Sequence, residues 1–89
     1  MKLYHGTNTP APIIAGNMRK GTWLAGNLFH AFRIAERRKK QRGGKSIVVE
    51  IDVDASVLHM ENSRNLPTYK FNGGAYKATN TPEMVQTKI

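Results

Sequence analysis

The chain has 89 residues and a mass of 10.0 kDa, which is too short for two independent cores, so we expect one domain over residues 1–89. The absence of cysteine excludes disulfides, thiolate metal sites and a cysteine nucleophile. The formal net charge of +8 favours nucleic acid or an acidic protein surface as a partner, because a positive field attracts polyanions.

The amino-terminal residues lack the basic segment and apolar run of a signal peptide. No apolar stretch approaches the roughly 20 residues that span a bilayer. The sequence therefore predicts a cytoplasmic protein that makes no membrane contact.

The amino-terminal quarter of the chain predicts two short strands joined by a helical turn. Residues 2–5 alternate in polarity and precede a run of turn formers, which indicates a strand and a loop. The next apolar residues predict one helical turn that ends at Gly16, with Ile13 and Ile14 closing one end of the core. A second strand is expected at residues 22–25.

The most regular pattern in the chain is helical. Asn27 is a suitable cap, because its side-chain oxygen can accept hydrogen bonds from the first turn of a helix. The apolar residues that follow are spaced three and four apart and share one face: Leu28, Ala31, Phe32 and Ala35. These features predict a helix over residues 28–41.

The second half of the chain begins with the clearest strand, residues 46–54, in which β-branched residues alternate with acidic ones. We expect a turn at 55–58, a loop at 60–67, a hairpin or binding loop at 69–76 around the Asn-Gly-Gly step, and a closing strand at 84–89. This order of elements predicts an α+β fold with a mixed or antiparallel sheet and one main helix.

A dense run of cations ends the predicted helix and continues into a glycine-containing loop. Its members are Arg37, Arg38, Lys39, Lys40, Arg42 and Lys45. Cations near a helix carboxyl end are favoured by the helix dipole, so a solvated face explains part of the run. The number of cations and the flexible loop favour contact with a polyanion or an acidic partner.

Histidines elsewhere in the chain do not form a metal site. His30 lies on the predicted helix near arginines, and His59 lies in a weakly patterned segment. Neither histidine has the spacing of metal ligands, so no metal site is expected.

The order of segments resembles the ADP-ribosyltransferase superfamily, especially its small phage and bacterial members and its RNA 2′-phosphotransferase relatives. The resemblance is carried by Leu-Tyr-His-Gly-Thr at 3–7 and Gly-Thr-Trp-Leu-Ala at 21–25. The alanines of the predicted helix, the strand at 48–53 and Glu83 follow in the same order. The resemblance implies an ADP-ribosyltransferase-like fold that uses NAD as substrate, in a protein of phage or mobile-element origin.

The resemblance also implies roles for individual residues. His5, Gly6 and Thr7 would hold the adenosine-side ribose and the amide, and Glu83 would be the late acid. The nicotinamide pocket would be lined by Thr22, Trp23 and Ala25, with Tyr69 and Tyr76 as alternative stacking partners. Loss of nicotinamide leaves an oxocarbenium-like ribose, which a carboxylate can stabilise while a hydrogen bond from His5 orients the sugar.

Some of these residues, and the function itself, have a second interpretation. A single Trp in a small core is a natural packing centre, and Glu83 after a proline also suits a turn. The short chain favours a second function, a catalytically silent inhibitor or binding protein that docks on nucleic acid or on an acidic protein. An RNA 2′-phosphotransferase would need cations around the site, whereas the sequence places most of them at one helix end.

Overall fold

The computed structural model describes residues 1–9, 11–62 and 67–80, and it contains six strands and one long helix within those ranges. The elements follow in the order β1 (Lys2–Thr7), α1 (Ala11–Ile14), β2 (Trp23–Ala25), α2 (Leu28–Arg42), β3 (Ile47–Val53), a 3₁₀ turn (Ala55–Val57), β4 (Leu58–Asn62), β5 (Thr68–Phe71) and β6 (Tyr76–Asn80). The predicted closing strand at 84–89 lies outside the described residues.

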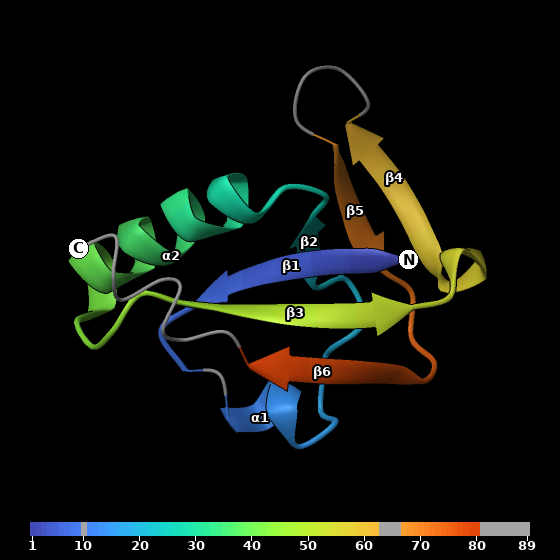
Figure 1. Cartoon of the computed structure of the whole chain (residues 1–89), viewed down its shortest axis with the longest axis horizontal. Helices are drawn as coiled ribbons and strands as arrows, with labels where there is room; N and C mark the ends of the chain where they lie inside the picture. The colour runs from blue at the N-terminus through green and yellow to red at the C-terminus, as the bar shows by residue number, and fades with distance from the viewer. Residues whose placement is uncertain (10, 63–66, 81–89) are drawn as a thin grey trace.

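The strands form one antiparallel sheet in the order β4-β5-β2-β1-β3-β6. β1 and β3 are its longest pair, with a register that runs from Lys2 opposite Asp52 to Thr7 opposite Ile47. Figure 1 shows β1, β3 and β6 side by side, with β4 and β5 at a steep angle to them. The α+β class and the antiparallel sheet are therefore as predicted.

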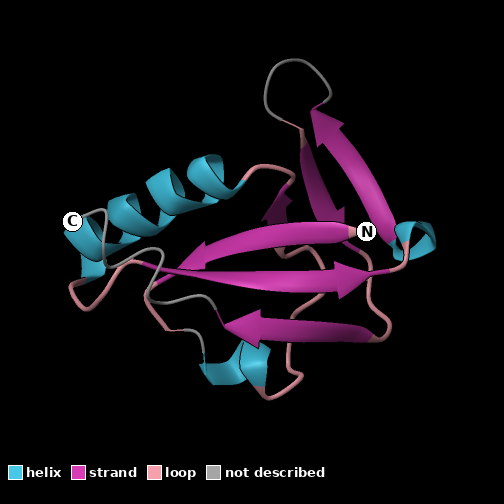
Figure 2. Ribbon diagram, viewed as in Figure 1, coloured by secondary structure: helices cyan, strands magenta, loops and turns pink. Residues whose placement is uncertain are grey.

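The helix α2 lies against β1 and β3, as Figures 1 and 2 show, and its contact with the sheet depends on small residues. Ala31 and Ala35 are fully buried on its inner face. A Cβ atom at Gly6 would lie 2.0 Å from the carbonyl oxygen of Ala31. Only glycine therefore allows β1 and α2 to approach so closely.

Local signals explain where α2 begins and ends. The side chain of Asn27 accepts hydrogen bonds from the backbone N–H groups of Phe29 and His30, at 2.8 and 3.2 Å. Gly43 follows the last turn with a φ of 77°, a conformation that side chains rarely adopt. The helix predicted over residues 28–41 is confirmed, with one further residue at its carboxyl end.

The core has two parts, one on each face of the sheet. The larger part packs Leu3, Leu24, Ile51 and Phe71 together on the face that α1 covers through Ile13. The smaller part lies beneath α2 and includes Ala25, Ala31 and Val48. The expectation that Ile14 also closes the core is wrong, because its side chain is 44% exposed.

Two expectations for the second half of the chain are corrected by the sheet. Residues 58–62 form β4, although 60–67 was predicted as a loop. β5 and β6 flank the turn at 72–74 but do not pair with each other: β5 pairs with β2 and β4, and β6 pairs with β3. The turn therefore carries the chain from one half of the sheet to the other.

Candidate functional site

The centre of the candidate site is a histidine whose ring is fixed by the neighbouring strand. His5 lies on β1, and its Nδ1 is 2.8 Å from the backbone carbonyl oxygen of Trp23 on β2. A carbonyl can only accept a hydrogen bond, so the proton is on Nδ1 and that nitrogen donates. In the neutral ring the second nitrogen, Nε2, is then a hydrogen-bond acceptor.

The environment of His5 favours this neutral form. Burial lowers the pKa of His5 below the ordinary value of 6.5, and the charge of Arg38 lowers it further. The hydrogen bond to Trp23 acts in the opposite direction but does not outweigh burial. At neutral pH the side chain is therefore an uncharged group with one fixed donor and one acceptor.

A surface cleft of about 460 Å³ opens beside His5. Its volume lies in the range of roughly 300–1,000 Å³ that is typical of small-molecule sites. Polar lining comes from β1, from the segment between α1 and β2, and from α2: His5, Thr7, Thr9, Asn17, Arg19, Thr22 and Arg38. The cleft therefore combines residues that lie up to 33 positions apart in the sequence.

The wall of the cleft formed by residues 11–22 is held in place by hydrogen bonds. The hydroxyl of Tyr76 donates to the carbonyl of Ile13 at 2.9 Å, which ties α1 to β6. The hydroxyl of Thr22 donates to the carbonyl of Arg19 at 2.6 Å. The backbone N–H of Gly21 donates to the carbonyl of Phe71 at 2.6 Å. The bonds of Tyr76 and Gly21 thus tie the segment to β6 and β5, and the bond of Thr22 shapes the segment itself.

The charge of the cleft is positive. Arg19 and Arg38 belong to its lining, and no Asp or Glu among the described residues does. Such a cleft attracts an anionic ligand, and two guanidinium groups suit phosphate oxygens because each group presents several donors in a planar fork.

The structure brings together four of the residues that the family resemblance implies. His5, Thr7, Thr22 and Trp23 all line the cleft. The hydroxyl of Thr7 already accepts a hydrogen bond from the backbone of Thr9 at 3.0 Å, so it shapes the loop after β1. The two strand motifs of the sequence therefore meet at one site, because β1 and β2 are neighbours in the sheet.

Trp23 also serves as the packing residue that the sequence left as an alternative. Its ring contacts His30 of α2 edge to face, with centroids 5.0 Å apart, and it packs beside the core beneath α2. Its backbone meanwhile holds His5. One residue thus links the cleft to the helix.

Other residues in the expected set do not line the cleft. Gly6 is buried under α2, so its need for glycine comes from helix packing and not from approach of a ligand. Ala25 is fully buried in the core beneath α2. Tyr69 and Tyr76 pack against the larger core, and the Tyr76 ring contacts Phe71. Glu83 lies outside the described residues.

Sequence reasoning missed three polar residues of the cleft, Thr9, Asn17 and Arg19. Asn17 and Arg19 lie in the segment between α1 and β2. That segment has no periodic pattern, so only the fold places it beside β1. Arg38 was expected to bind a partner as part of the basic run, and it also lines the cleft. The other members of that run lie on α2, except Lys45, which follows it.

No group of three or more His, Asp or Glu residues in ranges 1–9, 11–62 and 67–80 is arranged to hold a metal ion. None of the helices described there is long and apolar enough to cross a membrane.

Comparisons with known proteins give no match: no family model fits the chain, and no curated protein or solved structure is significantly similar to it.

Proposed function

We propose that the cleft beside His5 binds NAD and that the protein transfers ADP-ribose from it to a macromolecular target. The observation that carries this proposal is the meeting of two strand motifs in one positive cleft. His5 and Thr7 come from the first motif, and Trp23 comes from the second. Both motifs resemble those of ADP-ribosyltransferases, and this resemblance also favours NAD as the ligand.

The charge and hydrogen-bonding groups of the cleft suit a dinucleotide. NAD carries a pyrophosphate, and Arg19 and Arg38 supply guanidinium groups for its oxygens. With its Nδ1 proton directed to Trp23, neutral His5 can accept a hydrogen bond from a ribose hydroxyl through Nε2. A ring fixed in this way orients the sugar without loss of rotational freedom on binding.

The proposed reaction breaks the bond between the nicotinamide nitrogen and C1′ of the ribose. Nicotinamide leaves with the bonding electron pair, and positive charge develops on the sugar. A nucleophilic atom of the target forms a new bond to C1′ and releases its proton to solvent. Glu83 is the proposed acid that stabilises the developing charge and orients the nucleophile.

A transfer assay tests this proposal. Release of nicotinamide and labelling of targets are measured for the wild type, His5→Ala and Glu83→Gln. We expect His5→Ala to abolish transfer in a folded protein, and Glu83→Gln to lower transfer far more than NAD affinity. Undiminished transfer in both variants would show that the site has been assigned to the wrong residues.

A second candidate function is a basic binding protein that has no catalytic activity. The cations of α2 favour it, since none of them forms an ion pair with another described residue. In that case, replacement of Arg37, Arg38, Lys39 and Lys40 by Ala removes partner binding and its salt dependence, whereas His5→Ala leaves binding unchanged.

A further inference from the structure

The outer surface of α2 carries a concentration of charge that the described part of the fold does not neutralise. The helix contains six cations and one acid, Glu36. All ion pairs found between described residues lie elsewhere, at the amino group of Met1 and in β1, β3, β4 and β5. Unpaired cations on one helix attract a polyanion more strongly than the same cations spread over the surface.

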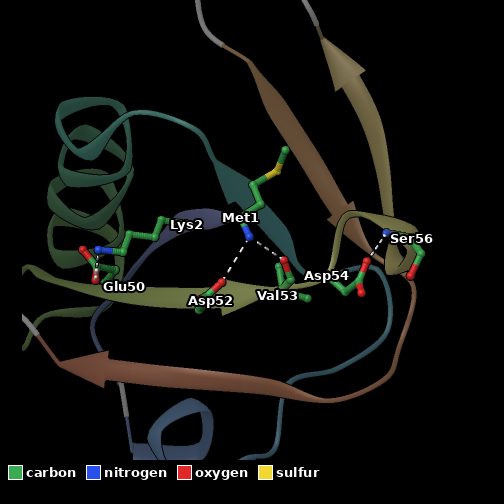
Figure 3. Close-up of polar contacts among 7 residues, drawn as sticks. All are labelled: Met1, Lys2, Glu50, Asp52, Val53, Asp54 and Ser56. Carbon is green, nitrogen blue, oxygen red and sulfur yellow. Dashed lines mark hydrogen bonds and ion pairs between the residues drawn. The ribbon is translucent and has the colours of Figure 1, made fainter.

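The acidic residues of β3 and of the turn after it form hydrogen bonds or ion pairs with groups that do not belong to α2. Figure 3 shows the amino group of Met1 beside Asp52, at 3.1 Å, and Asp54 accepting from the backbone N–H of Ser56 at 3.0 Å. Glu50 pairs with Lys2 at 4.0 Å on the same pair of strands. These three carboxylates therefore have partners outside α2, and none of them pairs with a cation of the helix.

Two hollows lie along this helix and lead to the cleft. The outer hollow, of about 240 Å³, is lined by Arg33, Glu36, Arg37 and Lys40. The middle hollow, of about 260 Å³, is lined by Trp23, Ile34, Arg37, Arg38 and Gln41. Arg37 belongs to both hollows.

The middle hollow also adjoins the cleft. Trp23 and Arg38 line both of them, so shared residues link the three neighbouring concavities from the outer face of α2 to the cleft beside His5. The outer and middle hollows together are named the docking track. The Nε atom of Arg38 is buried and has no hydrogen-bond partner among the described residues.

The composition of the track favours a particular kind of polyanion. Arginines and a lysine suit phosphates, whereas Trp23 and Ile34 offer an apolar surface between them on which a flat base can lie. Gln41 can form hydrogen bonds with the edge of a base. An acidic peptide would use the cations but not the apolar surface, and a duplex keeps its bases stacked inside.

We propose that the docking track binds a single-stranded nucleic acid and presents it to the cleft as the acceptor of the transfer reaction. Binding along the track is independent of NAD, whereas the acceptor role rests on the proposed function. The strand crosses from the outer hollow past Arg37 and reaches the cleft between Trp23 and Arg38.

The test compares two charge reversals on the same helix. Arg37→Glu lies in the track, and Lys39→Glu lies roughly 200° away around the helix, on the opposite flank. Affinity for short fluorescent oligothymidylate and oligouridylate is measured by anisotropy, with duplex DNA and a polyglutamate peptide as competitors. The two oligonucleotides distinguish DNA from RNA as the source of the strand.

We expect Arg37→Glu to weaken oligonucleotide binding at least about tenfold and to reduce the slope of log K against log salt by about 0.7 per lost phosphate contact. Lys39→Glu should change the affinity by less than about threefold, because at that distance only screened, long-range repulsion acts. Bound oligonucleotide should quench the fluorescence of Trp23, the only tryptophan of the chain.

Equal losses of oligonucleotide affinity in Arg37→Glu and Lys39→Glu would contradict binding along the docking track, because they would show that only the net charge of the protein attracts the strand. Tighter binding of the peptide or of the duplex would overturn the choice of a single strand. NAD affinity is measured in parallel and should fall much less than oligonucleotide affinity in Arg37→Glu, because Arg37 does not line the cleft and only screened repulsion acts there. Oligonucleotide binding without NAD binding would reject the proposed function and retain the track.

Discussion

The imidazole of His5 and the backbone carbonyl of Trp23 are joined by a hydrogen bond of 2.8 Å between neighbouring strands. The bond fixes both the orientation and the tautomer of the ring. The side chain of Trp23 packs toward α2 while its backbone serves the cleft. A change in the packing of α2 on the sheet would therefore alter the position of the His5 ring.

The first prediction concerns pH. Burial lowers the pKa of His5 below 6.5 in the folded chain, so the unfolded chain takes up this proton first as the pH falls. The free energy of unfolding should therefore decrease from about pH 6.5 down through the folded pKa of His5, and this contribution should be constant at lower pH. Urea unfolding across this range should show a smaller decrease for His5→Gln than for the wild type.

His59→Gln is the matched control for this measurement, since His59 lies on β4 and is exposed. The control should retain the decrease that is assigned to His5. A His5→Gln profile that is identical to that of the wild type would contradict the lowered pKa.

The second prediction concerns the contact between β1 and α2. A methyl group at residue 6 would meet the backbone of Ala31 at 2.0 Å and that of Ala35 at 2.8 Å, and backbone cannot move aside as a side chain can. Gly6→Ala should therefore destabilise the fold by about 3 kcal/mol or more, as measured by urea unfolding. At Gly26 the nearest atoms are 3.5 Å away, so Gly26→Ala should cost less than about 1 kcal/mol.

The third prediction concerns the amino-terminal end of α2. Asn27→Ala removes the acceptor for the N–H groups of Phe29 and His30 and should lower the free energy of unfolding by about 1 kcal/mol. Asn27→Ser retains a capping oxygen and should behave like the wild type. Equal stability of all three proteins in thermal unfolding would exclude a capping role.

The fourth prediction concerns the wall of the cleft. Tyr76→Phe removes the hydrogen bond to Ile13 and should cost about 1 kcal/mol of stability. Because this bond holds α1 at the cleft, the variant should also bind NAD more weakly. Tyr69→Phe is the control, since no hydrogen bond of its hydroxyl to a described residue is found, and both quantities should be unchanged in it. A Tyr76→Phe protein with wild-type NAD affinity would show that this anchor does not shape the cleft.

Much of the fold follows from local signals in the sequence. The apolar spacing of α2, its cap at Asn27 and the β-branched residues of β3 each determine an element without help from distant residues. β4 has no comparable signal: its described side chains are exposed or half-buried, and it pairs only with β5, at the end of the sheet. The Asn-Gly-Gly turn favours a hairpin between the strands on either side of it, but β6 pairs with β3, and β5 pairs with β2 and with β4.

The candidate site was predictable only in part, for a related reason. His5 and Thr7 could be identified with Trp23 because their strand motifs are recognisable and the strands are neighbours. Arg19 lies in a segment without a periodic pattern, and Arg38 lies on one flank of α2. Both reach the cleft only because the tertiary fold places these elements beside β1, and no local spacing in the sequence indicates that placement. The reason for glycine at residue 6 likewise appears only once α2 is placed on the sheet.

Calorimetric titration with NAD tests the central claim most directly. It should be made on the wild type, on His5→Ala and on His59→Ala, each shown to be folded by circular dichroism. We predict saturable binding by the wild type and by His59→Ala, and a loss of at least about tenfold in affinity for His5→Ala, because a fixed hydrogen-bonding group in the cleft is removed. Absence of binding to the wild type at millimolar NAD, or equal affinity in all three proteins, would contradict the account.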